Sequence, residues 1–91
     1  HERKQVMFMN SDTIIILPGG IGTLDEFFEV LTWRQLNLHN KKIYVLNING
    51  FWNKLIGLLD ELVSQEFVEG SVRDYFTVIT TIDEIDLLLK N

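Results

Sequence analysis

The stretch TIIILPGGIGTLDE, residues 13–26, decides the fold of this 91-residue chain. Its first five residues, Thr13 to Leu17, form a continuous apolar and β-branched run, which is typical of a strand covered on both faces in a parallel sheet. Pro18 ends this run, and three glycines within four positions form a loop. Apolar residues at helical spacing then predict a helix from Leu24 to about Asn37.

The flanking sequence continues the alternation of strands and helices. The predicted order is helix, strand, helix, strand, helix, strand, helix, which implies parallel strands joined by right-handed crossovers. We therefore expect an α/β fold: a Rossmann-like parallel sheet with flanking helices, forming the C-terminal half of a doubly wound domain. Before the decisive stretch, residues 1–10 predict a helix that turn-forming residues 10–12 close. After it, strands are predicted at Ile43–Asn47 and Tyr75–Ile79, with a helix between them that follows Asn49-Gly50. A last helix is predicted after a capping box formed by Thr81-Ile82-Asp83-Glu84.

The composition is that of one small globular unit, with 46% hydrophobic and 23% charged residues. A formal net charge of -5 argues against nucleic acid as a partner, because duplex binding usually needs a basic face. The chain has no cysteine, which excludes disulfides and Cys-based zinc sites, and no apolar run of membrane-spanning length. We expect a cytoplasmic protein without a membrane partner, a metal or a cofactor.

The start of the chain, His1-Glu2-Arg3-Lys4, has no initiator methionine. Three predicted strands are also few for a parallel sheet. We therefore expect residues 1–91 to form a single partial nucleotide-binding α/β domain whose N-terminal half is absent.

The glycine-rich turn is a candidate phosphate site. Glycines lack Cβ, so their amides can adopt unusual dihedral angles and approach a ligand closely. The helix that follows presents N–H groups and the positive end of its dipole to an anion. The turn matches neither a Walker loop nor the dinucleotide fingerprint G-x-G-x-x-G. The alternative is a plain structural turn in which Thr23 caps the helix and Glu26 closes a capping box.

Two motifs resemble those of the LONELY GUY proteins, cytokinin riboside 5'-monophosphate phosphoribohydrolases that are often described as lysine decarboxylases. The Pro-Gly-Gly-x-Gly-Thr-x-x-Glu pattern of residues 18–26 is similar to the family signature, and the His-x-Arg-Lys pattern of residues 1–4 is similar to its second motif. The resemblance covers nearly the whole chain. It continues through Glu29-Val30-Leu31-Thr32-Trp33, Gln35-Leu36, His39 and Leu46-Asn47-x-x-Gly50.

The resemblance implies that Arg3 and Glu26 are catalytic. The family reaction cleaves the N-glycosidic bond of a purine nucleoside 5'-monophosphate and gives free base and ribose 5-phosphate. A carboxylate suits this reaction because it can stabilise positive charge on the ribose and orient water, while a guanidinium offers a fixed set of donors. The resemblance further implies that the nucleotide and its phosphate contact Lys4, Gly19, Gly20, Gly22 and Thr23, with Thr32 as an additional candidate.

A non-catalytic nucleotide or cofactor carrier on the same fold is the alternative function, because a fold does not fix a function. A carrier needs the phosphate loop but has no use for the pair Arg3 and Glu26. Lysine decarboxylation is disfavoured, because the sequence gives no support for a pyridoxal phosphate lysine.

The helix predicted after the turn is apolar over more than one side, which favours a homodimer or higher homo-oligomer, as the resemblance to a dimeric family also implies. Trp33 and Trp52 are interpreted as core or subunit contacts rather than stacking platforms for a base. His39 is interpreted as a surface or turn residue.

Overall fold

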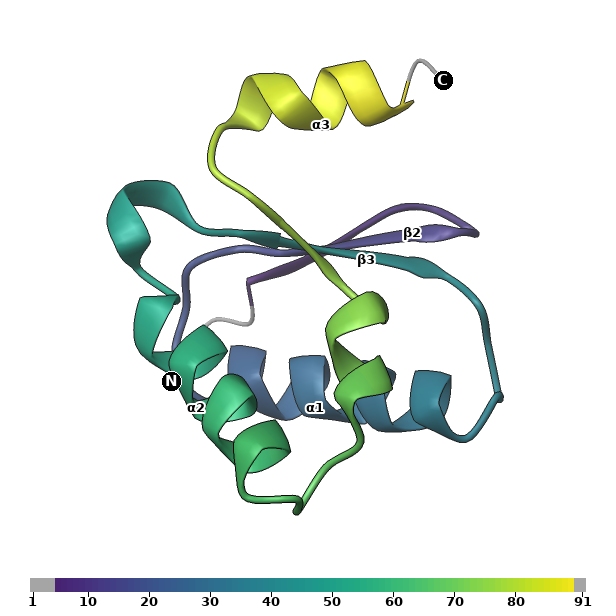
Figure 1. Ribbon diagram of the computed structural model, residues 1–91. Helices are drawn as coiled ribbons and strands as arrows, with labels where there is room; N and C mark the ends of the chain where they lie inside the picture. Colours follow the sequence, from purple (N-terminus) through teal and green to yellow (C-terminus); the bar gives the residue numbers. More distant parts are fainter. Residues whose placement is uncertain (1–4, 90–91) are drawn as a thin grey trace.

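The computed structural model describes residues 5–89 as a four-stranded sheet with helices on both faces (Figure 1). Within these residues, no helix combines the length and apolar character needed to cross a bilayer. The elements are β1 (Val6–Asn10), β2 (Thr13–Ile16), α1 (Ile21–Gln35), β3 (Lys42–Leu46), the 3-10 helix η1 (Ile48–Gly50), α2 (Asn53–Ser64), the 3-10 helix η2 (Gly70–Asp74), β4 (Thr77–Ile79) and α3 (Ile82–Leu89).

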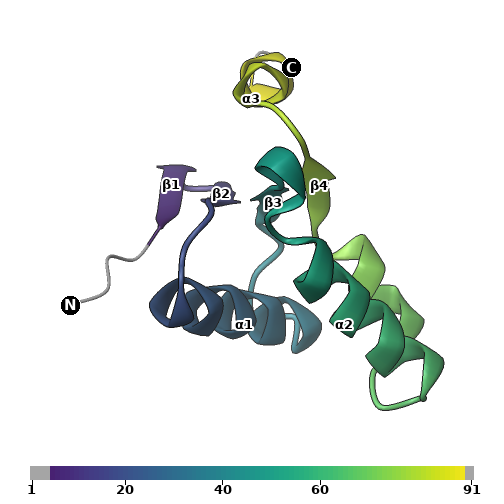
Figure 2. The same cartoon turned by 90° about the vertical axis from the view of Figure 1, so that its left-hand side faces the viewer.

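The strands lie in the order β1-β2-β3-β4. Strands β2, β3 and β4 are parallel to one another, whereas β1 is antiparallel to β2. Helix α1 connects β2 to β3 and α2 connects β3 to β4, and both helices cover the same face of the sheet (Figure 2). Helix α3 lies on the opposite face. The predicted Rossmann-like α/β fold is therefore confirmed, with a sheet that is mostly parallel.

Strand β2 is buried along its whole length because helices cover both of its faces. Ile14 and Ile16 pack in the core beneath α1 and α2, while Ile15 packs on the α3 side with Tyr44 and Ile79. This two-sided burial explains the absence of polar alternation in the strand.

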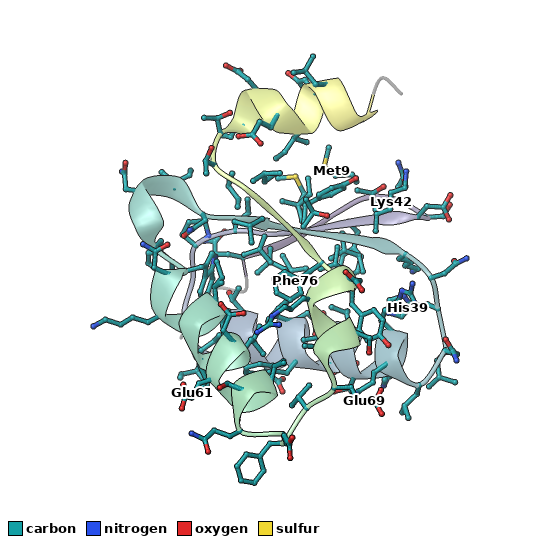
Figure 3. The ribbon with its side chains drawn as sticks, viewed as in Figure 1. Met9, His39, Lys42, Glu61, Glu69 and Phe76 are labelled. Atoms are coloured by element: carbon teal, nitrogen blue, oxygen red, sulfur yellow. The ribbon has the colours of Figure 1, made fainter. Side chains whose placement is uncertain are left out.

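The layer between the sheet and α1 is centred on Phe27, which is fully buried. Its ring meets the ring of Phe76 edge to face, with centroids 5.7 Å apart. Figure 3 shows Phe76 between the sheet and the helices. This contact ties α1 to the segment that leads into β4.

The helix predicted at residues 1–10 is wrong: Val6–Asn10 form β1. Val6 pairs with Ile16, and the hairpin closes at a turn in which the Asn10 Oδ1 accepts a hydrogen bond from Asp12 N at 2.7 Å. Four apolar residues in a row are too few to distinguish a helical from an extended pattern. Pairing with β1 satisfies the main-chain groups on the outer edge of β2, and this tertiary contact decides the conformation.

The predicted last helix is confirmed as α3, although its cap differs from the predicted box. The Glu84 carboxylate accepts hydrogen bonds from the hydroxyl and the main-chain N–H of Thr80, at 2.7 and 3.1 Å, whereas the hydroxyl of Thr81 lies 3.5 Å away. These bonds, above all that from the hydroxyl, hold the pKa of Glu84 below its ordinary value of 4.5. The stability they contribute is present at neutral pH and is lost as the pH falls through the lowered pKa.

Candidate functional site

The carboxyl ends of the three parallel strands meet at one edge of the sheet. The segments that leave this edge are residues 17–20 after β2, residues 47–50 after β3 and residues 80–81 after β4. Ligands of open α/β sheets bind at this edge. The glycine-rich turn therefore occupies the position that the sequence predicts for a binding site.

Gln5 is anchored to the glycine-rich turn by two hydrogen bonds. Its main-chain N–H donates to the hydroxyl of Thr23 at 2.9 Å, and its carbonyl oxygen accepts from the N–H of Leu17 at 2.8 Å. The side chain of Thr23 is fully buried at this junction. The predicted site residues Arg3 and Lys4 lie outside the described residues, immediately before Gln5 in the sequence.

Position 19 requires glycine because there is no space for a Cβ, and not because of its backbone dihedral angles. A Cβ at Gly19 would overlap the Thr23 Oγ1 and would lie 3.0 Å from the Gln5 Cβ. Among the described glycines, a positive φ occurs at Gly50, not in the turn. Gly19 thus packs closely against Thr23 and Gln5, a structural role, and the turn contains no positive φ. Close approach of the glycine amides to a ligand stays a prediction.

Replacing Gly19 with alanine should destabilise the protein by about 1–3 kcal/mol, because the buried Thr23 cannot move aside without losing its bond to Gln5. Gly57 is a matched control, because it is exposed in α2 with no atom within 4 Å of an added Cβ. Gly57→Ala should stabilise the protein by about 0.5–1 kcal/mol. Urea unfolding of the full-length gene product measures both, and equal effects of the two substitutions would contradict the steric explanation.

Helix α1 begins three residues earlier than the sequence predicts. Gly20 is the N-cap residue, and the first helical hydrogen bond runs from the N–H of Leu24 to the carbonyl oxygen of Gly20 at 3.0 Å. Thr23 therefore lies inside the first turn and does not cap the helix. Glu26 lies in the second turn, so the structural reading of Thr23 and Glu26 as a capping box is wrong.

The first turn of α1 carries no acidic side chain. Within the described part of α1, no acidic side chain of the first turn therefore compensates the positive end of the helix dipole. Gly19, Gly20, Gly22 and Thr23 all lie at this helix start, so the structure brings four of the predicted site residues together.

Glu26 lines a cavity of about 290 Å³ between α1 and the hairpin of β1 and β2. Within residues 5–89, its carboxylate makes no hydrogen bond and no ion pair. Trp33, expected in the core or at a subunit contact, is 48% exposed on the wall of this cavity. The complete lining is Phe8, Ile14, Glu26, Glu29, Val30, Trp33, Leu38, His39 and Lys41.

Of the nine residues that line this cavity, Glu26 alone was among the predicted site residues. Phe8 was missed because its segment was interpreted as a helix. Glu29 follows Glu26 by three residues on the same helix, and this spacing alone indicates a shared face.

Thr32 lies apart from the other candidates. It is exposed on α1, and six residues of helix turn its side chain roughly 120° away from that of Glu26. It does not line the cavity beside Glu26. Within one chain, the structure does not bring Thr32 together with the glycine-rich turn.

His39 supports the loop between α1 and β3 (Figure 3). The main-chain N–H of Lys41 donates to its Nδ1 at 3.0 Å, and its Nε2 lies 2.8 Å from the carbonyl oxygen of Val30. Since an amide N–H can only donate and a carbonyl can only accept, the neutral ring must carry its hydrogen on Nε2. The interpretation of His39 as a turn residue is confirmed.

Asn47 and Trp52 are likewise structural. The Asn47 Oδ1 accepts from the N–H of Trp52 at 2.6 Å, and its Nδ2 donates to the Asn53 Oδ1 at 2.8 Å. Trp52 is buried in the core, as the sequence predicts for it. These contacts fix the turn that leaves β3.

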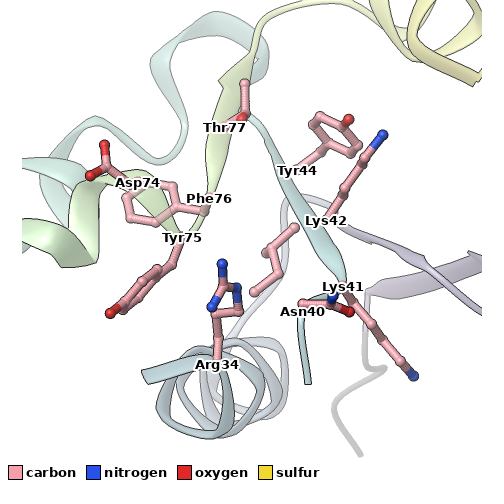
Figure 4. Close-up of a pocket in the computed structure, with 10 residues that line it drawn as sticks. Arg34, Asn40, Lys41, Lys42, Tyr44, Asp74, Tyr75, Phe76 and Thr77 are labelled. Atoms are coloured by element: carbon pink, nitrogen blue, oxygen red, sulfur yellow. The ribbon is translucent and has the colours of Figure 1, made fainter. Parts of the chain in front are cut away.

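A second cavity of about 290 Å³ lies at the opposite, amino-terminal ends of β3 and β4 (Figure 4). The guanidinium of Arg34 reaches into it from α1, and its Cζ lies 4.9 Å from the centroid of the Tyr75 ring. The ammonium groups of Lys41 and Lys42 point away from Arg34. Arg34 is in the last turn of α1, where a cation complements the helix dipole. This cavity is separate from the glycine-rich turn.

The family model described as "Possible lysine decarboxylase" matches residues 1–88. A probable cytokinin riboside 5'-monophosphate phosphoribohydrolase of Oryza sativa subsp. japonica is 39% identical over 85 residues, 93% of this chain and 37% of the relative. Two Arabidopsis thaliana proteins named cytokinin riboside 5'-monophosphate phosphoribohydrolase are also similar. The first is 40% identical over 93% of this chain, and the second is 44% identical over 80% of this chain. The aligned parts are 40% and 34% of those two proteins.

The chain thus spans between 34% and 40% of the length of these three relatives. The chain belongs to the family described as possible lysine decarboxylase, and within it to the LONELY GUY proteins.

Proposed function

We propose that the protein is a nucleoside 5'-monophosphate phosphoribohydrolase that cleaves the N-glycosidic bond of a purine or cytokinin ribonucleotide. The observation that carries this proposal is the position of Glu26. Its carboxylate, free of partners in the described residues, lines a cavity on the helix whose first turn is the candidate phosphate site. The relatives bear the names of cytokinin riboside 5'-monophosphate phosphoribohydrolases.

The candidate phosphate site and Glu26 lie close together along α1. Glu26 follows the first residue of α1 by five positions, about 7.5 Å along the helix axis. The 5'-phosphate and C1' of one nucleotide can span this separation. A phosphate at the first turn would thereby bring the ribose to the carboxylate.

A carboxylate at C1' suits the proposed reaction. As the bond from C1' to the base breaks, its electron pair leaves with the base and positive charge develops on the ribose. A carboxylate at residue 26 would stabilise this charge and orient the water that adds to C1'. The proton released by the water balances the negative charge on the departing base, so the products are free base and ribose 5-phosphate.

Arg3 is the proposed catalytic partner of Glu26, and Lys4 a proposed phosphate contact. Two residues of chain span at most about 7 Å, and Arg3 precedes the anchored Gln5 by two residues. The guanidinium stays protonated, so its proposed role is to donate hydrogen bonds to an anionic group rather than to transfer a proton. Gly19, Gly20, Gly22 and Thr23 are the proposed phosphate cradle, with Thr32 as a further proposed contact.

The alternative is a carrier that binds a nucleotide or cofactor without cleaving it. The test is to incubate the full-length gene product with adenosine 5'-monophosphate and to separate the products by chromatography. A phosphoribohydrolase releases adenine and ribose 5-phosphate in equal amounts. Recovery of the intact nucleotide, with binding detected by equilibrium dialysis, would favour the carrier and overturn the proposal.

We further propose that the protein is a homodimer or a higher homo-oligomer. Three large apolar side chains of α1 and its C-cap are exposed, at 39%, 48% and 62% of their surfaces: Phe28, Trp33 and the C-cap residue Leu36. Large apolar groups in such number on one helix favour a covering partner. Sedimentation equilibrium of the full-length gene product at micromolar concentration should therefore give at least twice the monomer mass, and a monomer would contradict this proposal.

A further inference from the structure

The cavity beside Glu26 contains a second carboxylate, that of Glu29. Residues three apart on a helix share a face, with Cβ atoms about 5–6 Å apart. Trp33 follows Glu29 by four residues and lies on the same face. Going away from the glycine-rich turn, this face of α1 thus presents a carboxylate, a second carboxylate and an indole to one cavity.

The second carboxylate has no partner within the described residues. Glu29 is exposed and makes neither a hydrogen bond nor a salt bridge there, although Lys41 also lines the cavity. An ionised carboxylate only accepts hydrogen bonds. The cavity therefore offers acceptor sites to a ligand that carries N–H or O–H donors.

The walls beside Glu29 suit a flat aromatic ligand. Phe8 on β1 is 57% exposed and Trp33 on α1 is 48% exposed, and both line the cavity. Aromatic side chains stack on any base, because every base has a π-face, so they bind bases without choosing among them. Discrimination among bases must then come from a polar group at the base edge, and Glu29 lies between Glu26 and Trp33 along the helix.

We propose that Glu29 is a specificity-determining residue that selects bases with an exocyclic amino group. This inference rests on the proposed function, which places the ribose at Glu26 and the base further along α1. An amino group donates hydrogen bonds to the carboxylate, whereas a carbonyl oxygen in the same position presents lone pairs to it. An aminopurine nucleotide is therefore favoured over the oxopurine nucleotide of the same shape.

The test compares adenosine and inosine 5'-monophosphates, whose bases carry an amino group and a carbonyl oxygen respectively at C6, and which differ also at N1, where only the inosine base bears a hydrogen. In the full-length gene product, kcat/KM for the adenosine nucleotide should exceed that for the inosine nucleotide by at least tenfold. Glu29→Gln should reduce this ratio to within about threefold of unity, because an amide can either donate or accept. The control Asp25→Asn removes the same charge from a neighbouring exposed position that does not line the cavity, and it should leave the ratio within about twofold.

Two results would overturn the role of Glu29: no preference in the unmodified protein, or an equal change of the ratio in both variants. Failure of the proposed function is a different result, namely no hydrolysis of either nucleotide. In that case equilibrium dialysis measures the dissociation constants of the adenosine and inosine nucleotides. Their ratio then replaces the ratio of kcat/KM values, and the same two results would overturn the role of Glu29. Thermal unfolding of Glu29→Gln should match that of the unmodified protein, because the side chain is exposed.

Discussion

Replacing Glu26 with glutamine in the full-length gene product should lower kcat for purine nucleoside monophosphate hydrolysis by about 10²–10⁴-fold. Glutamine has nearly the same shape but lacks the negative charge that opposes the positive charge on the ribose in the transition state. KM should change little, because the lost interaction strengthens only as that charge develops. Steady-state kinetics with adenosine 5'-monophosphate measures both constants.

The stability of Glu26→Gln should stay within about 0.5 kcal/mol of the unmodified protein, because the carboxylate has no partner among the described residues. Asp25→Asn is the matched control, since it removes a charge from the adjacent exposed residue, outside the cavity. Its kcat should remain within about twofold of the unmodified value. A fully active Glu26→Gln protein would rule out the catalytic role of Glu26.

Replacing Gly22 with valine should weaken binding of a nucleoside monophosphate by about 10–100-fold, which corresponds to the loss of one charged hydrogen bond. Gly22 lies in the first turn of α1, where a branched side chain would keep the phosphate from the main chain. Binding of the free nucleoside should change by less than about threefold, because the nucleoside has no phosphate to displace. Isothermal titration calorimetry with both ligands measures the difference.

Gly57→Val is the control for this experiment, because position 57 is exposed in α2 and has open space around it. It should leave the affinities for both ligands unchanged. An equal loss of monophosphate and nucleoside binding in Gly22→Val would instead indicate that the turn has lost its native conformation.

The parallel part of the fold could be predicted because its signals are local. The run from Thr13 to Leu17 is apolar on both faces, and Pro18 with three glycines can only be a turn. The strand at residues 43–47 and the last helix follow from similar patterns. β1 could not be predicted in this way, because Val6 to Met9 give no periodicity and their conformation depends on pairing with β2.

The start of α1 was misplaced for a related reason. Glycines at positions 20 and 22 have low helix propensity, and Thr23 with Glu26 has the pattern of a capping box. In the structure the Thr23 hydroxyl is instead used by Gln5, a contact across 18 residues of sequence. The cavity beside Glu26 could not be predicted from the sequence either. Phe8, Glu29 and Trp33 line one cavity only because the hairpin of β1 and β2 packs against α1.

The most direct test of the account is the position of a bound nucleotide. A crystal structure of the Glu26→Gln full-length gene product with adenosine 5'-monophosphate should show the phosphate at the first turn of α1. The ribose C1' should then face residue 26, with the base in the cavity that Glu29 and Trp33 line. A nucleotide whose phosphate lies instead beside Arg34, in the cavity at the amino-terminal ends of β3 and β4, would contradict the account.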